Sequence, residues 1–263
     1  LYQLFAHRGK VALFHNRLFY VTEEKVMANK IIAIVQARTK ARRLPGKMLL
    51  KLHGHPIIAW IFERIKKSQL LETTVFAIPD EGSDDSLAKI LINLGAEVFR
   101  GSEFDLVDRF YQAAKKWKAT HIVRVCADNP FISGSEIDSL VRFYFSSNYD
   151  YAYNHIPKNN LYPDGIGAEI TSFEILETIH NQAKEAGHRE HLFDFIWTHS
   201  NRFKIGTFNP EDYRLACPSL RLDINTKEDF DRLSTMNVDI EMEAHEIVAA
   251  AKNLRNYKTK KFI

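Results

Sequence analysis

The sequence predicts an α/β protein built on a mixed, mostly parallel sheet with helices on both faces. Three observations support this expectation. Short β-branched runs alternate with segments whose apolar residues recur at helical spacing. The first run is apolar throughout, as is typical of a strand buried on both faces of a parallel sheet. A loop rich in Lys and Arg follows it, and ligands of open α/β sheets bind where the strands end.

The first predicted strand, residues 31–35, leads directly into this basic loop at residues 36–47. Cations at the end of a buried strand favour an anionic ligand such as a nucleoside triphosphate, because Arg can grip two phosphate oxygens at once. A solvated basic loop is the simpler alternative. Pro45-Gly46 is a turn signal that can direct Lys47 back toward the same site, and the glycines of a Walker loop are missing. The loop carries Arg38, Lys40, Arg42, Arg43 and Lys47.

The alternation continues to about residue 150. Ser83-Asp84-Asp85 offers an N-cap for a helix that Gly95 can end, and Ser135 can start another. The apolar stripe of a further helix begins at Phe104. Strands are predicted at 74–78, 96–100 and 122–126, and helices at 57–65, 83–94, 104–117 and 135–144.

The second half is less regular. A polar loop rich in Gly, Pro and Asn covers residues 157–167, and long loops of this kind commonly belong to a substrate site. Residues 27–263 are expected to form a single domain, whose less regular part covers roughly 151–210. Strands are predicted at 151–153, 168–171, 203–208 and 220–224, and helices at 175–179, from Arg189 to Ile196, at 227–236 and at 242–254.

Composition limits the class of protein. The 263 residues carry 36 Lys and Arg against 33 Asp and Glu, and a net charge of only +3 argues against a nucleic-acid binder. No apolar stretch approaches the roughly 20 residues that span a bilayer, so membrane insertion is not expected. Cys126 and Cys217 lie far apart and form neither a metal pair nor a disulfide framework, so we interpret both as small buried residues of a cytoplasmic protein.

Residues 1–26 have no clear hydrophobic period. Glu23-Glu24-Lys25 can be encoded by purines alone, as a ribosome-binding site read in frame would be, and Met27 follows. We therefore hypothesise that the functional protein starts at Met27 and that residues 1–26 are a non-native extension. The alternative is a short β element added to the edge of the sheet. N-terminal sequencing of the native protein would decide between them.

Acidic side chains follow other predicted strands. Asp128 comes directly after the strand at 122–126, at the rim that also holds the basic loop, and a carboxylate there can hold Mg²⁺. Asp164 and Glu169 flank two glycines and could accept hydrogen bonds from sugar hydroxyls. The alternatives are a turn or N-cap role for Asp128 and a plain β-turn for residues 162–169. His188 and His191 are one helical turn apart, but the further ligands of a zinc site are not found.

Gln36-Ala37-Arg38 and Arg43-Leu44-Pro45-Gly46-Lys47 resemble the signature loop of the cytidylyltransferases that activate sugar acids, the CMP-Kdo and CMP-sialic acid synthetases. The resemblance covers roughly residues 29–250 and is strongest to the branch of spore-coat polysaccharide protein F. It implies a Rossmann-like nucleotide-diphospho-sugar transferase fold, with this loop around the triphosphate of CTP. The implied CTP-binding residues are Gln36, Ala37, Arg38, Arg43, Lys47 and Asp128, of which Arg38, Lys47 and Asp128 are implied to be catalytic.

The resemblance also implies a metal site and a sugar site. The metal would be Mg²⁺, held by Asp128 and by a late strand, where the family pattern has Asp at the position of Asn225. Asp223 lies two residues earlier on the same strand face and could supply the missing carboxylate. Glu228 and Asp229 are expected to cap the next helix. The implied sugar-binding residues are Asp164, Glu169, Arg189 and His191.

Two further segments match the family and carry simpler interpretations. Asp105 to Arg109 precedes a long helix, where Asp108 and Arg109 could orient neighbouring loops; an internal ion pair between them is the interpretation we favour. Ser83 to Asp85 lies where the family shapes its base pocket, and helix capping is the stronger interpretation.

The function implied by the resemblance is transfer of a cytidylyl group from CTP to a sugar, expected to be a keto-sugar acid, for surface polysaccharide biosynthesis. Pyrophosphate would be released. A homodimer is implied, formed through the less regular part at 151–210. Two alternatives stay open: a non-catalytic nucleotide-binding homologue, which Asn225 favours, and a glycosyltransferase on a related fold. The latter would need an Asp-x-Asp motif at a strand end, which is not seen before Asp223.

Overall fold

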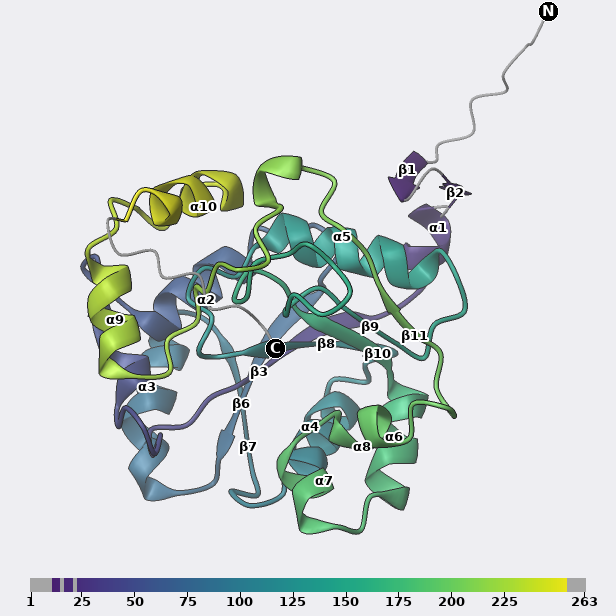
Figure 1. Cartoon of the computed structure of the whole chain (residues 1–263). Helices are drawn as coiled ribbons and strands as arrows, with labels where there is room; N and C mark the ends of the chain where they lie inside the picture. Colours follow the sequence, from purple (N-terminus) through teal and green to yellow (C-terminus); the bar gives the residue numbers. More distant parts are fainter. Residues whose placement is uncertain (1–10, 15–16, 21–22, 255–263) are drawn as a thin grey trace, which may run out of the picture.

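The computed structural model describes residues 11–14, 17–20 and 23–254. Its centre is a seven-stranded sheet in the order β11-β9-β10-β8-β3-β6-β7 (Figure 1). All neighbours are parallel except β10, which is antiparallel to both β8 and β9. The prediction of a mixed, mostly parallel sheet is therefore confirmed. The strands are β3 (Ile31–Gln36), β6 (Thr73–Pro79), β7 (Glu97–Gly101), β8 (His121–Cys126), β9 (Tyr151–Tyr153), β10 (Glu169–Ser172) and β11 (Ile205–Thr207).

Strand β3 is buried on both faces, which explains its uninterrupted apolar sequence. Ile31 and Val35 belong to the apolar cluster on one side of the sheet, and Ile32 and Ile34 belong to the cluster on the other. All four are at most 1% exposed. Alternate side chains of a strand point to opposite faces, so both helical layers anchor on this one strand.

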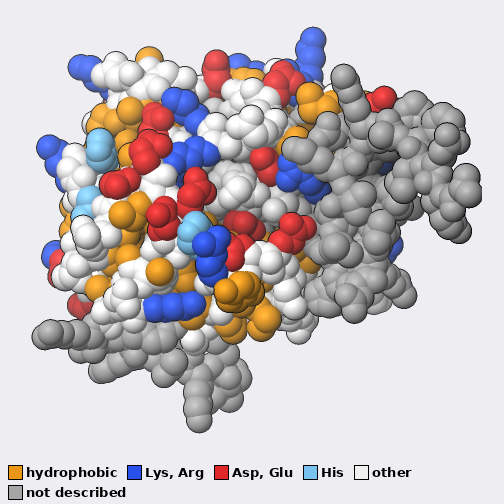
Figure 2. Space-filling model, turned by 90° about the horizontal axis from the view of Figure 1, so that it is seen from above, with side chains coloured by type: hydrophobic (Ala, Val, Ile, Leu, Met, Phe, Trp, Pro, Cys, Tyr) orange, Lys and Arg blue, Asp and Glu red, His pale blue; other side chains and the backbone are white. Residues whose placement is uncertain are grey.

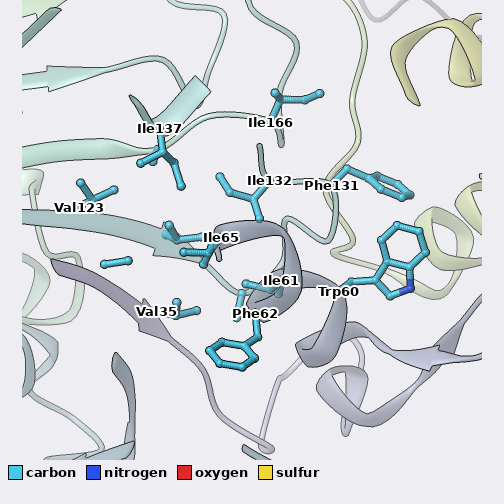
Figure 3. Packing of buried hydrophobic residues seen from close by; sticks show 14 of the residues in the cluster. Val35, Trp60, Ile61, Phe62, Ile65, Val123, Phe131, Ile132, Ile137 and Ile166 are labelled. Carbon is cyan, nitrogen blue, oxygen red and sulfur yellow. The ribbon is translucent and has the colours of Figure 1, made fainter. Parts of the chain in front are cut away.

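The first helical layer packs on the face that holds Val35 and Val123 (Figure 3). Trp60 is fully buried, meets Phe131 edge-on at 5.4 Å between ring centroids and donates its indole N–H to Leu52 O at 2.7 Å. The layer contains α2 (Ile57–Ile65), α3 (Asp85–Asn93), α5 (Gly134–Phe145) and α10 (Ala244–Lys252), with α1 (Glu23–Met27) packed against α5.

The second layer covers the opposite face, below the sheet in Figure 1. Its longest helices, α4 and α6, contact each other, and α7 contacts α4. On the face seen in Figure 2, acidic and basic side chains are interspersed. In the part of the chain that the structure describes, no helix is both long and apolar enough to cross a membrane. The helices are α4 (Leu106–Lys116), α6 (Phe173–Gln182), α7 (Ala186–Glu190) and α8 (Asp194–Thr198).

The carboxyl ends of the central strands meet at one edge of the sheet. Gln36, the last residue of β3, pairs with Cys126 of β8 on one side and with Ala77 of β6 on the other. From β3 the chain runs outward through β6 and β7 and then returns to β8 on the other side of β3. This reversal of strand order makes β3 and β8 the topological switch point, where open α/β sheets bind ligands.

The remaining elements are short or lie outside the sheet. At the start of α9 the capping role expected of Asp229 is confirmed, because Thr226 and Asp229 form a reciprocal capping box, whereas Glu228 lies in the first turn outside that box. Gly95 ends α3 as expected, with φ +79° and a Schellman pair of hydrogen bonds. These elements are β1 (Val11–Phe14), β2 (Arg17–Tyr20), β4 (Lys51–Leu52), β5 (His55–Pro56), α9 (Lys227–Ser234) and the 3-10 turns η1 (Lys47–Leu49), η2 (Gly82–Asp84) and η3 (Tyr213–Leu215).

Three expectations about elements are wrong. Residues 220–224 are not a regular strand, because the segment bonds only to single residues, Asp164 and Asp128. The helix expected from Arg189 is divided into α7 and α8. The helix expected from Phe104 begins two residues later, because Asp105 caps it by accepting from Asp108 N at 2.8 Å.

The N-terminal hypothesis falls partly outside the described residues, since 1–10, 15–16 and 21–22 are not among them. Strands β1 and β2 pair with each other in a separate two-stranded sheet. The described part of residues 1–26 therefore does not extend the edge of the main sheet, which was the alternative. Val26 of α1 is buried in the core.

Candidate functional site

A cavity of about 420 Å³ lies at the carboxyl ends of β3 and β8. Its walls come from the basic loop, the turn after β8, the start of α4, the end of α7 and the segment before α9. The sequence therefore predicted both strand ends that frame it. The lining residues are Gln36, Ala37, Arg38, Ala41, Arg42, Arg43, Leu44, Lys47, Met48, Glu103, Phe104, Leu106, Arg109, Cys126, Ala127, Asp128, Glu190, His191 and Asn225.

The basic loop folds back over the end of β3. Gly46 adopts φ +69°, a left-handed conformation that favours glycine, and its N–H donates to Thr39 O at 3.0 Å. This turn places Lys47 in the cavity wall, where its Nζ donates to Ile224 O at 2.9 Å. Pro45-Gly46 thus directs Lys47 to the site as expected.

Asp84 fastens the start of this loop. Its carboxylate accepts from Thr39 N at 2.6 Å and from Thr39 Oγ1 at 2.8 Å, and the residue is 1% exposed. The favoured capping interpretation is wrong for Asp84, which occupies the N-cap position of α3 but makes no side-chain capping bond.

The cations of the loop differ in environment. Burial lowers the pKa of Lys47, and the nearby Asp128 opposes this effect. Arg38, Arg42 and Arg43 are exposed at the cavity. Lys40 does not line the cavity and lies 3.9 Å from Glu81.

Arg109 lines the cavity, a position that the sequence analysis did not predict for it. It is 5% exposed, and Nη1 donates to Ser102 O at 2.8 Å, whereas Nε has no hydrogen-bond partner among the described residues. Burial, and then the charge of Arg38, lowers its pKa to about 10. A buried, incompletely bonded cation beside a second one is costly without an anionic or polar ligand.

The ion pair expected between Asp108 and Arg109 is not among the contacts of the described residues. Asp108 instead accepts from Gln112 and lies 2.9 Å from His180. One signal in the sequence could have identified Arg109. It lies one helical turn after the start of α4, on the apolar side of a helix that begins close to the end of β7.

Asp128 presents the open carboxylate of the site. It lies in the cavity wall, and its side chain makes no hydrogen bond or ion pair within the described part of the chain. Its backbone oxygen accepts from Ile224 N at 2.8 Å, which fixes the segment before α9 against the end of β8. An open carboxylate beside a cationic loop fits Mg²⁺, which commonly takes one or two carboxylates together with substrate phosphates.

The other two predicted metal residues are already bonded. Asp223 is 4% exposed and receives a bidentate bond from Arg221, at 3.0 Å from Nε and 2.5 Å from Nη2. Asn225 donates from Nδ2 to Asp223 and accepts from Arg43 Nη2 at 2.5 Å. The described residues bring together no group of three His, Cys, Asp or Glu side chains poised for a metal ion. Phosphate oxygens would have to complete any coordination.

Asp164 lies beside this cluster, 3.5 Å from Arg221 Nη2. Burial, and then the charge of Asp223, raises its pKa to about 7. Gly165, with φ +100°, permits the contact, because a Cβ there would lie 2.9 Å from Asp223 N. The structure therefore places Asp164 next to the metal candidates, although it does not line the cavity.

Of the remaining residues predicted for the sugar site, only His191 lines the cavity. His191 is exposed and lines the cavity with Glu190. Arg189 turns away, donating to Asp105 from Nε at 2.8 Å and to His180 O from Nη1 at 2.8 Å. Glu169 is 2% exposed and accepts from Arg124 and Tyr151, and Arg124 in turn donates to Gln36 at 3.0 Å. Glu169 thus supports the cavity wall from behind.

Neither cysteine forms a disulfide bond among the described residues, and both are half-buried rather than fully buried as expected. Cys126 lines the cavity, and burial raises the pKa of its thiol to about 12. A thiol with that pKa is a poor nucleophile at neutral pH.

The geometry combines a cationic loop, an open carboxylate and a topological switch point. A family model described as Cytidylyltransferase matches residues 32–258, which include all of these features. The chain belongs to the cytidylyltransferase family. It is a nucleotidyltransferase, and the resemblance found in its loop is confirmed.

This cytidylyltransferase has relatives along most of its length. It is 39% identical to an uncharacterized protein of Methanocaldococcus jannaschii, over 76% of this chain and 80% of that protein. It is 32% identical to the spore coat polysaccharide biosynthesis protein SpsF of Bacillus subtilis, over 79% of this chain and 86% of SpsF.

Solved structures agree with the fold. A cytidylyltransferase from Leptospira borgpetersenii superposes with a TM-score of 0.80 at 26% identity, covering 89% of this chain and 99% of that one. A CMP:2-keto-3-deoxy-manno-octonic acid synthetase complexed with CTP has a TM-score of 0.60 at 15% identity, over 78% of this chain and 97% of that one. The latter likeness concerns the fold alone.

Proposed function

We propose that this cytidylyltransferase transfers the cytidylyl group of CTP to a hydroxyl of a sugar acid and releases pyrophosphate, in the cytoplasm and for surface polysaccharide biosynthesis. The observation that carries the proposal is the basic loop folded over the end of β3, opposite the open Asp128 carboxylate at the end of β8. The name of SpsF supports a role in polysaccharide biosynthesis, and the synthetase that shares the fold is complexed with CTP and named for a keto-sugar acid.

In this proposal the loop binds the triphosphate. Arg38, Arg43 and Lys47 line one wall of the cavity and neutralise phosphate charge, most strongly at the position where pyrophosphate leaves. Gln36 and Ala37 lie where β3 enters the cavity and contact the nucleotide. Catalysis consists of positioning and charge neutralisation, which needs no nucleophilic side chain.

The residues around Asp128 fit Mg²⁺. Asp128 would hold the ion together with phosphate oxygens, and Asn225, which is bonded to the buried Asp223, lines the same cavity. When bound, the ion supplies positive charge that stabilises the phosphate oxygens and orients the attacking hydroxyl. The sugar acid would enter between His191 and the loop that holds Asp164, with Glu169 and Arg189 supporting that region from behind.

The experiment is pyrophosphate release from CTP and Mg²⁺ with a panel of keto-sugar acids. Arg43→Ala should weaken CTP binding at least tenfold, a loss of about 1.4 kcal/mol. Lys40→Ala is the matched control, because Lys40 belongs to the same loop but does not line the cavity. Equal CTP affinity in both variants would contradict the loop assignment. CTP binding without pyrophosphate release from any acid would favour the non-catalytic alternative.

We also propose a homodimer formed through residues 151–210. This part holds β11, the last strand of the main sheet, which pairs on one side only among the described residues. Unpaired strand edges are usually covered or paired in soluble proteins. Light scattering at several protein concentrations should give twice the chain mass, and a monomer throughout would contradict the proposal.

A further inference from the structure

The segment before α9 presents three polar side chains on one face. Leu220, Leu222 and Ile224 are at most 1% exposed, and the residues between and after them are Arg221, Asp223 and Asn225. In an extended segment alternate side chains share a face. The two backbone bonds between Asp164 and residues 220–222, and the bond from Ile224 N to Asp128 O, hold the segment beside the end of β8.

Arg221 contacts two carboxylates, that of Asp223 on the same face and that of Asp164 in the neighbouring loop. Its guanidinium donates to both oxygens of Asp223 and lies 3.5 Å from Asp164 Oδ2. The arginine side chain is 40% exposed, whereas that of Asp223 is 6% exposed. Gly165 lets the loop lie this close, because any side chain there would press on residues 222 and 223. The fold is therefore shaped to bring both carboxylates to one cation.

Asn225 completes the cluster. Asp223 Oδ1 accepts from Arg221 Nε, and Oδ2 accepts from Arg221 Nη2 and from Asn225 Nδ2. Both oxygens of Asp223 are thus used within the chain, whereas the side-chain oxygens of Asp128 are open toward the cavity. The carboxylate of Asp223 is therefore fully bonded and that of Asp128 is open, although the two residues lie close together: Ile224, the residue after Asp223, donates its backbone N–H to Asp128 O.

We propose that Arg221 takes the place of a second divalent metal ion in this site. The guanidinium joins Asp164 to Asp223 as a bridging metal ion would, and its charge is a fixed part of the chain. The site then binds a single divalent ion, through Asp128 and the phosphates of the nucleotide. The inference rests on the proposed function only for the nucleotide that supplies these phosphates.

The test counts bound Mn²⁺ from the EPR signal of free Mn²⁺, on the protein alone and with α,β-methylene CTP, which cannot release pyrophosphate. The wild type should bind one Mn²⁺ in the nucleotide complex. Arg221→Gln should bind one more, with or without nucleotide, because Asp164 and Asp223 lose their cation and become free to hold a metal. Arg221→Lys is the matched control and should keep the wild-type count.

Two further variants test the same inference by removing a carboxylate in place of the arginine. Asp223→Asn should keep the wild-type count, and Asp128→Asn should lose the Mn²⁺ bound with nucleotide. A second Mn²⁺ in the wild type, a loss in Asp223→Asn or an unchanged count in Arg221→Gln would overturn the inference. If Arg221→Gln does not fold, as judged by thermal unfolding, Asp223→Asn and Asp128→Asn decide.

The result also separates this inference from the proposed function. Failure of α,β-methylene CTP to raise the melting temperature of the wild type would contradict CTP as the substrate. The gain of Mn²⁺ by nucleotide-free Arg221→Gln does not depend on that outcome, and its absence in a folded variant counts against Arg221 alone.

Discussion

Asn225, at the position where the resemblance implies an aspartate, uses both polar atoms of its amide. Its oxygen accepts from Arg43, and its nitrogen donates to Asp223. An aspartate could serve Arg43 but would set a second carboxylate against Asp223, and two like charges in contact cannot both stay ionised without a cation between them. The amide of Asn225 can accept from Arg43 and donate to Asp223 without adding a further negative charge beside Asp223 and Arg221.

Arg109 carries the first prediction at the residue scale. Arg109→Gln should weaken CTP binding at least tenfold, about 1.4 kcal/mol, because the variant removes a buried cation that faces the cavity beside Arg38. The melting temperature without nucleotide should hold or rise, since the variant also removes the cost of burying that charge.

The control for Arg109 is Arg214→Gln, which removes an exposed arginine that pairs with Asp212. Calorimetric titration with CTP gives the affinities, and thermal unfolding gives the stabilities. Equal affinity in Arg109→Gln and Arg214→Gln would mean that Arg109 only supports the start of α4.

At the scale of elements, the basic loop depends on its connection to the start of α3. Asp84→Ala should leave Thr39 N–H buried without its acceptor, which costs about 1–3 kcal/mol. We expect faster hydrogen exchange at Thr39 and several-fold weaker CTP binding. Asp85→Ala is the matched control, because the neighbouring Asp85 is exposed and pairs with Arg100. Slow exchange at Thr39 in Asp84→Ala would contradict this role.

The contact of β8 with α5 predicts a pH dependence. His121 begins β8 and meets Phe145 at 4.7 Å between ring centroids, and burial lowers its pKa to about 4. The unfolded chain takes up this proton near pH 6.5. Stability is therefore fully present above pH 6.5 and is lost as the pH falls toward 4.

The measurement for His121 is the melting temperature as a function of pH. His121→Phe should lose less stability than the wild type between pH 6.5 and 4, by roughly 1–3 kcal/mol. His55→Phe, at an exposed position, should follow the wild-type profile. If the melting temperatures of all three proteins fell equally as the pH is lowered from 6.5 to 4, His121 would not be the cause of the loss of stability in acid.

At the scale of the whole molecule, the N-terminal hairpin stands apart from the main sheet. Strands β1 and β2 pair with each other, while Val26 packs in the core and Lys25 Nζ donates to Phe145 O at 3.1 Å. A chain lacking residues 1–22 should melt like the full chain. Val26→Ala should cost about 1–2 kcal/mol, since it removes buried apolar volume. If removal of residues 1–22 lowered the melting temperature more than Val26→Ala does, the hairpin would not be independent of the main sheet.

The sequence predicted the centre of the molecule better than its rim. The buried strand at 31–36 and the strand at 122–126 were visible because helices cover both faces of the sheet, so its central strands need apolar residues on both of their faces. Their ends located Lys47 and Asp128 at one cavity without any knowledge of long-range contacts. The turn at Gly46 was visible for a similar reason, since its conformation is a local property.

Contacts between distant segments were beyond sequence reasoning. Asp84 has the local features of a cap, and only the tertiary fold turns it toward Thr39. The extended segment at 220–224 alternates like a strand, but no regular strand pairs with it among the described residues. Arg109 was assigned to an ion pair because spacing shows which side chains are close in sequence and not which cavity they face.

The closing bonds of the basic loop join residues that are synthesised far apart in time. Arg43 bonds to Asn225 and Lys47 to Ile224, across 182 and 177 residues. A ribosome that adds roughly 5–20 residues per second needs about ten seconds or more to cover that interval. Throughout it, β3 and its cationic loop exist on the nascent chain without their final partners. The cavity wall with these two bonds is therefore complete only after residue 225 has emerged.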